Sequence, residues 1–286
     1  MAIINATPDS FSSSAPSTSA SALAEANAAV EGGADIIDVG GYSTRPGASH
    51  VSPEEELARV IPVIRQIRES GYILPISVDT FRPAVLRAAV EAGANCLNDV
   101  TALAGEESDG EGAASPGEMA RVASELRVPI VMMHSRGAHR AGSNQKYTHP
   151  GGVLNGVQHE LGKQIDDALR WGVRRWHMVV DPGFGFSKTM DGNVELLARM
   201  GELTAQSKRD RNPLEGFPTL AGVSRKSFLG RLVGTEKMEP QKRDWVTAAA
   251  VTAAVQQGAD VVRVHRVAET RQVLKVADAV WRRVRR

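Results

Sequence analysis

Eight short apolar segments, each separated from the next by a stretch with helical character, restrict this chain more than any other feature. Their continuous apolar runs are typical of strands buried on both faces, as in a parallel sheet. The segments are AIIN at 2–5, ADIIDVGG at 34–41, PISVDT at 75–80, CLNDV at 96–100, PIVMMH at 129–134, HMVVDPG at 177–183, TLAGVS at 219–224 and ADVVRVH at 259–265. The pattern therefore predicts a strand-then-helix unit repeated eight times.

The segments between these strands contain recognisable helix starts and ends. The run EEELARVIPVIRQIRES follows Ser52, a residue type that caps helices, and Pro53, which suits the first helical position. The run FRPAVLRAAVEAG ends in Gly93, a residue that commonly terminates helices. These signals predict helices immediately before the third strand and before the fourth.

Eight such units in 286 residues predict an α/β fold, a single-domain (β/α)8 TIM barrel over residues 1–286. An open doubly wound sheet is the alternative. That fold usually carries a glycine-rich phosphate turn after its first strand, and the sequence has none there. The barrel is therefore the better prediction.

Composition restricts the partners. The net charge of +1 gives no indication of a nucleic-acid or membrane partner, and no stretch approaches the ~20 apolar residues of a membrane helix. The single cysteine, Cys96, excludes an internal disulfide and any zinc site built from several thiolates. We expect a cytoplasmic protein, or a mitochondrial one if a longer polypeptide carries a targeting segment; the immediate start in a strand is compatible with such a longer polypeptide.

Polar residues stand at nearly every predicted strand end, where a TIM barrel places its active site. The first and last strands are neighbours in a closed barrel, and they carry Asn5, Arg263 and His265. These side chains suit a phosphorylated group, and Asn5 can give Mg²⁺ an oxygen ligand beside that group. Arg263 and His265 fall on one side of their strand if it alternates through both.

Four further polar residues at strand ends, Asp79, Asn98, Asp181 and Lys226, could surround a flat heterocycle. Two carboxylates and an amide can pair with the edge of a guanidine-like ring, and such a site rejects analogues that leave its buried polar groups unpaired. Lys226 shares its side with Ser224 if the seventh strand extends that far.

Each of these residues also has a purely structural interpretation. The structural alternatives are a helix cap for Asp79, a turn for Asp181, a solvated side chain for Arg45, and core positions for Met133, His134 and His265. For His134 we favour the core position. Because the polar residues coincide at seven strand ends, a shared site explains them better together.

The motifs NATPDSFS, DVGGYSTRPGA, ISVDTFRP, NDV, MMHSRG, DPGFGF, GVSRKSFLG and RVH, in this order along essentially the whole chain, resemble those of the dihydropteroate synthase family. The segments MMHSRG and GVSRKSFLGRLVG look like the fungal form, the C-terminal part of a multifunctional folate-synthesis protein. The resemblance implies condensation of 6-hydroxymethyl-7,8-dihydropterin diphosphate with 4-aminobenzoate to give 7,8-dihydropteroate and diphosphate.

The resemblance also implies a role for each matching residue. The pterin would be held by Asp79, Asn98, Met133, Asp181, Phe186 and Lys226. The diphosphate would be held by Asn5, Arg45, Arg263 and His265, with Mg²⁺ as cofactor on Asn5. The aminobenzoate would contact Phe11, Thr44, Pro46, Lys226 and Ser227, while Asp9 would support the closed first loop. Catalysis would rest on Lys226, Asp181, Arg263, His265 and Asp9.

The family further implies a homodimer and a possible fusion to other folate-pathway domains. The sequence departs from the usual pattern of the family in several places, among them SSSAPS after TPDSF, where SDGG is common, and two single positions. Tyr42 stands where bacterial members often have Glu, and Arg266 stands where Asp is usual, which we expect to disturb the orientation of His265. Arg225 has a structural alternative, an ion pair beneath the site.

The alternative functions are a pterin-binding methyltransferase barrel, which has no use for the STRP, SRKS and RVH motifs, and a non-catalytic pterin-binding module.

Overall fold

A computed structural model of the chain describes residues 1–6, 18–42, 50–103, 117–136, 147–206, 212–235 and 238–282. All eight predicted strands are present. They are β1 (Ala2–Asn5), β2 (Ile37–Gly40), β3 (Ile76–Asp79), β4 (Cys96–Asp99), β5 (Ile130–Met133), β6 (Met178–Asp181), β7 (Leu220–Ala221) and β8 (Val261–Val262).

Helices follow the strands and form an outer layer. Those of the described residues are α1 (Thr18–Glu31), α2 (Pro53–Glu69), α3 (Pro83–Glu91), α4 (Glu118–Leu126), α5 (Gly152–Arg170), α6 (Met190–Ala198), α7 (Met200–Leu203), α8 (Ser227–Leu232), α9 (Asp244–Gln256) and α10 (Val267–Trp281), with short 3-10 turns at Arg175–His177 and Pro240–Arg243.

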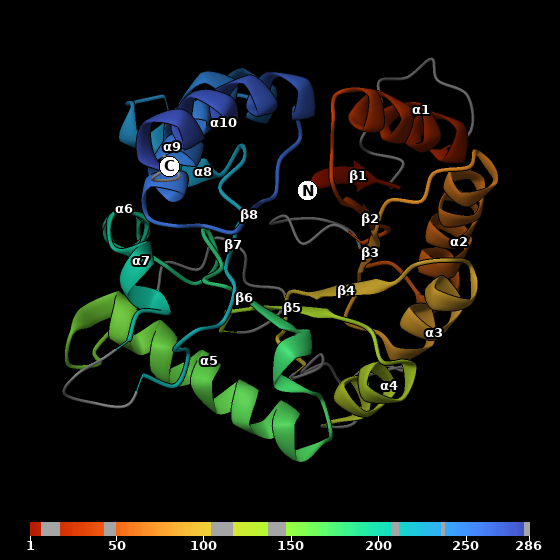
Figure 1. Cartoon of the computed structure of the whole chain (residues 1–286), viewed down its shortest axis with the longest axis horizontal. Helices are drawn as coiled ribbons and strands as arrows, with labels where there is room; N and C mark the ends of the chain where they lie inside the picture. Colours follow the sequence, from red (N-terminus) through yellow and green to blue (C-terminus); the bar gives the residue numbers. More distant parts are fainter. Residues whose placement is uncertain are drawn as a thin grey trace.

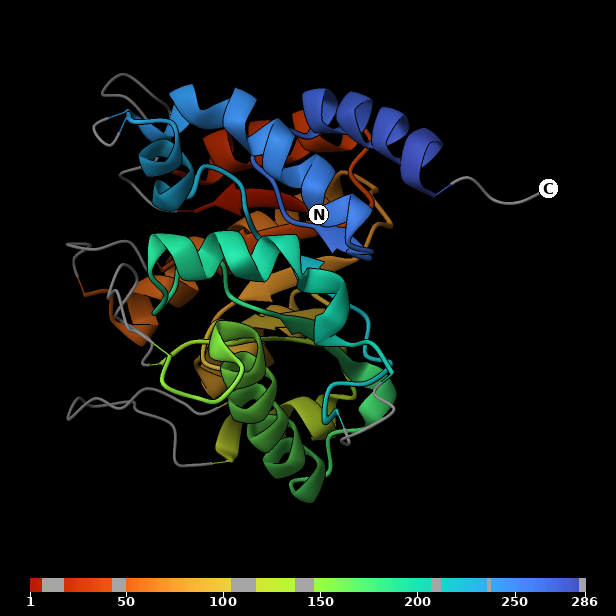
Figure 2. The ribbon, with the colours of Figure 1, turned by 90° about the vertical axis from the view of Figure 1, so that its left-hand side faces the viewer.

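The strands form a closed parallel ring. Strands β1 to β6 pair consecutively in one parallel sheet, and β7 pairs with β8. Single parallel bridges, Ala2 with Val264 and Val180 with Thr219, join the two sheets. Figure 1 shows the strands at the centre with the helices around them. In the view turned by 90°, the red α1 and the blue α9 and α10 lie on one side of the strands, and the green α5 lies on the other (Figure 2). The predicted (β/α)8 TIM barrel is confirmed.

The predicted helix signals are confirmed as well. Ser52 precedes α2 in an extended conformation, and its hydroxyl accepts the backbone N–H of Glu55 at 3.2 Å. Pro53 is the first residue of that helix. Gly93, just after α3, has a φ of +116°, which a residue with a Cβ rarely adopts.

The last two strands are shorter than predicted. Strand β7 ends at Ala221, so it does not extend to Ser224 and Lys226 as the alternation of those two residues required. Strand β8 ends at Val262, but the buried Val264 still bridges to Ala2, and Arg263 and His265 on either side of it both line the cavity, so their predicted placement on one side is confirmed. The backbone turns instead at Arg225, which has a φ of +58°. The Ser224 hydroxyl bonds the ring of His265 at 2.9 Å, so a side-chain contact joins the two segments where the ladder has ended.

A buried ion pair fastens α2 to the start of α3. Arg82 Nη1 lies 2.6 Å from Oε2 of Glu56, and their side chains are only 5% and 0% exposed. Arg82 Nη2 also donates to the carbonyl of Val51, 2.7 Å away. Arg82 therefore holds both the helix and the segment that enters it.

We predict that Arg82→Met destabilises the protein by about 3 kcal/mol, because it leaves the carboxylate of Glu56 buried without its cation. Urea denaturation at pH 7 measures this loss. The matched control is Arg87→Met, which removes an exposed ion pair with Glu125 and should change the unfolding free energy by less than about 1 kcal/mol. Equal effects of the two substitutions would contradict the importance of the buried pair.

Candidate active site

A cavity of about 640 Å³ opens at the carboxyl ends of the strands. Ten of the fifteen residues that the sequence predicted for the site line it. They are Asn5, Asp79, Asn98, Met133, Asp181, Phe186, Lys226, Ser227, Arg263 and His265. The other five, Asp9, Phe11, Thr44, Arg45 and Pro46, lie outside the described residues. The fold therefore brings together every predicted site residue that it describes.

Arg263 lies between two carboxylates within the ring of strands. Its Nε donates to Oδ2 of Asp38 at 2.7 Å, and its Nη2 donates to Oδ2 of Asp79 at 2.8 Å. The amide of Asn98 donates to the same Asp38 oxygen at 3.1 Å. Asp38 is fully buried and does not line the cavity, so it supports two predicted site residues from beneath.

Asp79 is expected to hold its proton more tightly than an ordinary carboxyl. Burial raises the pKa of Asp79, the positive charge of Arg263 opposes this rise, and the nearby Asp38 adds to it. The helix-capping interpretation of Asp79 is wrong, because α3 begins after Arg82 and no side chain caps its first turn. Asp79 instead points its carboxylate at Arg263.

Asp181 combines a structural contact with a place in the cavity wall. Its Oδ1 accepts the backbone N–H of Gly183 at 2.7 Å, which fixes the turn after β6. Burial raises the pKa of Asp181, whereas the Gly183 N–H and the charge of Lys226 lower it. Both sequence interpretations of Asp181, a turn residue and a residue of the cavity, therefore describe its position.

Lys226 lies over an aromatic ring. Its Nζ is 4.1 Å from the centroid of the Phe186 ring, a cation–π arrangement. Gly185 leaves room for this contact, since a Cβ there would lie 3.0 Å from Cδ of Lys226. Ser227 follows as the first residue of α8. Phe186 and Met133 belong to a small apolar cluster with Phe81 and Val100.

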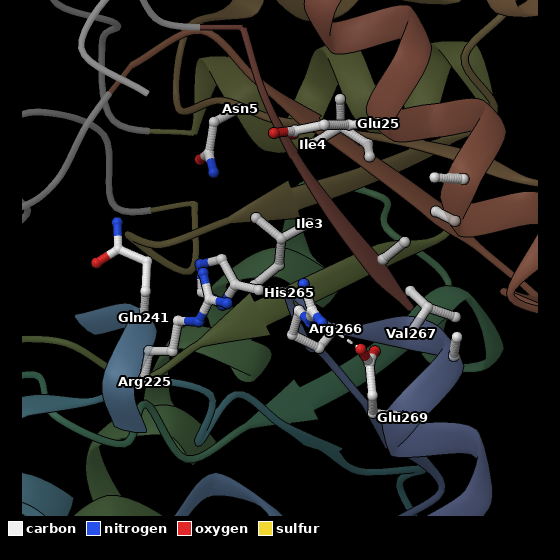
Figure 3. Close-up of a pocket in the computed structure, with 14 residues that line it drawn as sticks. Ile3, Ile4, Asn5, Glu25, Arg225, Gln241, His265, Arg266, Val267 and Glu269 are labelled. Atoms are coloured by element: carbon white, nitrogen blue, oxygen red, sulfur yellow. Dashed lines mark hydrogen bonds and ion pairs between the residues drawn. The ribbon is translucent and has the colours of Figure 1, made fainter. Parts of the chain in front are cut away.

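A second cavity, of about 460 Å³, adjoins the first between β1, α1 and the start of α10 (Figure 3). Asn5 and His265 line both cavities. Arg266 makes an ion pair with Glu269, while Ser224 holds Nδ1 of His265. The side chain of His265 is thus oriented by Ser224.

Arg225 takes the structural role given above as its alternative. Its Nε and Nη2 bind the two carboxylate oxygens of Asp244 at 2.8 and 3.1 Å, and its backbone N–H donates to Thr247. Arg225 therefore fixes the turn from which Lys226 projects.

The core position favoured for His134 is confirmed, since its side chain is fully buried. Sequence reasoning gave no role to Asp38 or to Tyr42, which lines the cavity. The register could have found Asp38, because it pairs with Ser77 on the strand that ends in Asp79, and a period of two places these three side chains on one face.

Residues 1–265 match the family described as pterin binding enzyme. The chain is 41% identical over 283 residues to a dihydropteroate synthase of Synechocystis, covering 99% of this chain and 90% of that protein. The chain belongs to the dihydropteroate synthase family. It is also 40% identical to the folic acid synthesis protein fol1 of Schizosaccharomyces pombe, over 98% of this chain but only 36% of that protein.

Solved structures of dihydropteroate synthases share the fold. The Xanthomonas albilineans enzyme with 4-aminobenzoic acid superposes with a TM-score of 0.83 at 41% identity, covering 98% of this chain and 91% of that one. The Yersinia pestis enzyme in complex with a sulfonamide drug gives a TM-score of 0.83 at 32% identity, covering 98% and 92%. This chain thus shares both sequence and fold with enzymes of this family.

We predict that Asp79→Asn changes how stability depends on pH. Because the pKa of Asp79 is raised in the fold, the wild-type carboxyl contributes stability that is complete below its unfolded pKa of 3.8 and is lost as pH rises above that value. The unfolding free energy of the wild type should therefore fall relative to that of Asp79→Asn as pH rises from 3.8 to about 7, by up to a few kcal/mol at about 1.4 kcal/mol for each pKa unit.

Urea denaturation of both proteins from pH 4 to pH 8 measures this difference. Asp278→Asn, an exposed Asp-to-Asn substitution on α10, is the matched control. A difference between wild type and Asp79→Asn that stays constant with pH would show that the carboxyl is ionised throughout.

Proposed function

We propose that this chain condenses 6-hydroxymethyl-7,8-dihydropterin diphosphate with 4-aminobenzoate, releasing diphosphate and forming 7,8-dihydropteroate. The observation that carries the proposal is one cavity lined by two carboxylates, an amide and a lysine together with Arg263 and His265. The related Xanthomonas albilineans enzyme has been solved with 4-aminobenzoic acid and with 7,8-dihydropteroate, which supports the same pair of substrate and product here.

In this proposal the pterin lies against Phe186 and Met133, with its polar edge on Asp79, Asn98 and Asp181. A buried carboxylate and a buried amide lose their hydrogen bonds when an analogue lacks the matching groups, so they select the pterin ring. Positive charge that develops on the pterin methylene is stabilised by Asp181, which faces the same cavity.

The diphosphate is assigned to Asn5, Arg263 and His265, and to Arg45, which lies outside the described residues. The guanidinium and the imidazole donate charge-assisted hydrogen bonds to the leaving oxygens. The amine of 4-aminobenzoate supplies the electron pair for the new C–N bond, the C–O bond to diphosphate breaks, and the amine then loses a proton. Because the amine attacks the pterin methylene directly, the reaction needs no covalent nucleophile from the protein.

Mg²⁺ remains a proposal for the same anion region. The described residues contain no group of three or more His, Cys, Asp or Glu side chains that could hold a metal ion. These residues therefore do not form a metal site built from protein ligands alone. Asn5 fits the other mode, in which Mg²⁺ takes few protein ligands and is completed by phosphate oxygens and water. A bound Mg²⁺ would neutralise charge on the leaving diphosphate.

The aminobenzoate is assigned to Lys226 and Ser227, together with Phe11, Thr44 and Pro46. Lys226 projects from the turn before α8 and lies over Phe186, so it can contact both substrates. Asp9 is assigned to support of the first loop. A pterin-binding methyltransferase or a non-catalytic module explains less, because neither uses Lys226 and the anion-binding residues together.

Three further proposals concern the whole protein. The segments MMHSRG and GVSRKSFLGRLVG favour the fungal form, although identities of 41% to the cyanobacterial relative and 40% to the fission-yeast one are nearly equal. A fusion to other folate-pathway domains is supported by that fission-yeast protein, of which this chain spans about a third. A homodimer is supported by exposed apolar side chains on α10, at Val276 and Val280.

The described residues contain no helix long and apolar enough to cross a membrane. We propose a cytoplasmic location, or a mitochondrial one where a longer polypeptide carries a targeting segment; one plant relative bears the name mitochondrial folate synthesis bifunctional protein.

We predict that Lys226→Ala lowers kcat/KM by at least a hundredfold, on the order of 3 kcal/mol, because it removes a preorganised cation from the reacting groups. Release of diphosphate from the pterin substrate, measured with and without 4-aminobenzoate and with and without Mg²⁺, is the assay. The control is Lys163→Met, an exposed lysine on α5. If the wild type released diphosphate equally fast with and without 4-aminobenzoate, the proposed reaction would be wrong.

We predict that Asp181→Asn weakens pterin binding about tenfold or more and leaves diphosphate binding nearly unchanged. The carboxylate lies at the ring pocket, and the loss of a charge-assisted hydrogen bond is worth about 1.5–3 kcal/mol. Titration calorimetry with each ligand separately measures the two affinities. Equal losses for the two ligands would contradict the separation of the ring pocket from the anion region.

A further inference from the structure

The loop between β6 and α6 forms one wall of the cavity and has an unusual backbone. Gly183, Gly185 and Ser187 have φ values of +69°, +81° and +50°. Of these, Ser187 carries a side chain in a conformation that favours glycine, so the surrounding structure must hold the loop in place. This loop presents Gly185 and Phe186 to the cavity beside Lys226.

A buried lysine holds the loop from behind. The side chain of Lys188 is 3% exposed, and it does not line the cavity. Its Nζ donates to the carbonyl of Gly183 at 3.0 Å and to the carbonyl of Phe186, also at 3.0 Å. The two carbonyls bracket the segment that carries the Phe186 ring, so one ammonium group sets the distance between them.

The third contact of Lys188 is made with a neutral histidine. Nζ lies 3.1 Å from Nδ1 of His134, and Nε2 of that ring lies 3.0 Å from Oε2 of Glu160. A carboxylate can only accept, so Nε2 carries the ring proton and Nδ1 is free to accept from Lys188. Burial lowers the pKa of His134 to about 4, which keeps the ring neutral.

The carboxylate of Glu160 is in turn fixed. It forms an ion pair with Arg136, whose guanidinium lies 3.8 Å over the ring of Tyr147. The backbone N–H of Arg136 donates to the hydroxyl of Ser187 at 3.1 Å. The chain of contacts therefore begins on α5, passes through His134 and Lys188, and ends on the loop that carries Phe186.

We propose that Lys188 is a positioning residue for the pterin site: by binding both carbonyls of the loop, it holds the Phe186 ring in the place where that ring contacts Lys226. All three of its ammonium protons have acceptors, which is why a lysine rather than an apolar residue occupies this buried position. The inference rests on the proposed pterin site. Lys188 does not touch the cavity, so it acts through Phe186 and takes no part in the chemistry.

The test is a double-mutant cycle on pterin affinity. Lys188→Met keeps the length of the side chain and removes its donors; Phe186→Ala removes the ring that Lys188 is proposed to hold. The affinity of each variant for the pterin diphosphate substrate is measured by calorimetry at pH 6.5, below the value of about 7 to which burial lowers the pKa of Lys188. Lys163→Met, an exposed lysine on α5, is the matched control.

We expect Lys188→Met to weaken pterin binding about tenfold in the presence of Phe186, and to have less than a twofold effect in the Phe186→Ala background, since coupled residues give non-additive changes. Lys188→Gln, which keeps two N–H donors without the charge, should fall between wild type and Lys188→Met. It also serves as the test variant if Lys188→Met fails to fold.

A purely structural role would lower the melting temperature while the folded variant keeps wild-type pterin affinity, and that result would overturn the inference. Equal effects of Lys188→Met with and without Phe186 would overturn it as well, and in that case the proposed function still stands. If the wild type itself binds no pterin, the proposed function is wrong and the inference falls with it.

Discussion

The pairing of one partly buried guanidinium with two carboxylates sets the arrangement of the mouth of this barrel. Arg263 follows the last strand, and its nearest carboxylates, Asp38 and Asp79, belong to β2 and β3. Because the guanidinium is largely removed from solvent, leaving it unpaired would be unfavourable, and the two carboxylates compensate its charge. Two acids share one cation, and the pKa of Asp79 rises as a result of burial and of the charge of Asp38. A diphosphate bound to Arg263 would compete with both carboxylates for the same N–H groups, which links the proposed anion region to the proposed ring pocket.

The fold followed from periodicity because a closed parallel barrel hides every strand on both faces. Continuous apolar runs therefore marked all eight strands, and β1 was predicted with its bounds correct. The ends of β7 and β8 were not predictable in the same way. There the ladder is replaced by a side-chain contact between Ser224 and His265 and by a left-handed turn at Arg225. The contact between Ser224 and His265 joins residues 41 positions apart in the sequence, so a local sequence pattern cannot predict it.

The cavity residues were predictable because they stand at strand ends, where polar residues break an apolar run. The residues that support them were not, since they share no local signal. Asp38 lies inside a strand and reads as an exception within an apolar segment, and Lys188 reads as an ordinary loop lysine. Their roles appear only when the register places Asp38 beneath Asn98, and when the turn after β6 folds back over Lys188. Motif resemblance predicted residues that line the cavity, whereas only the packing shows the residues that hold them in place.

The site therefore consists of two groups of polar residues. The upper level is the set of polar side chains that line the cavity, where a substrate can form hydrogen bonds with them. In the lower level, Asp38 and Lys188 have neighbours within hydrogen-bond distance at 2.7 to 3.1 Å, and neither lines the cavity. Fixing long side chains in advance reduces the conformational entropy that binding must otherwise remove. Lys226 already lies over Phe186 before a substrate binds, so binding does not have to order it. More of the interaction energy is then available to stabilise the transition state relative to the ground state.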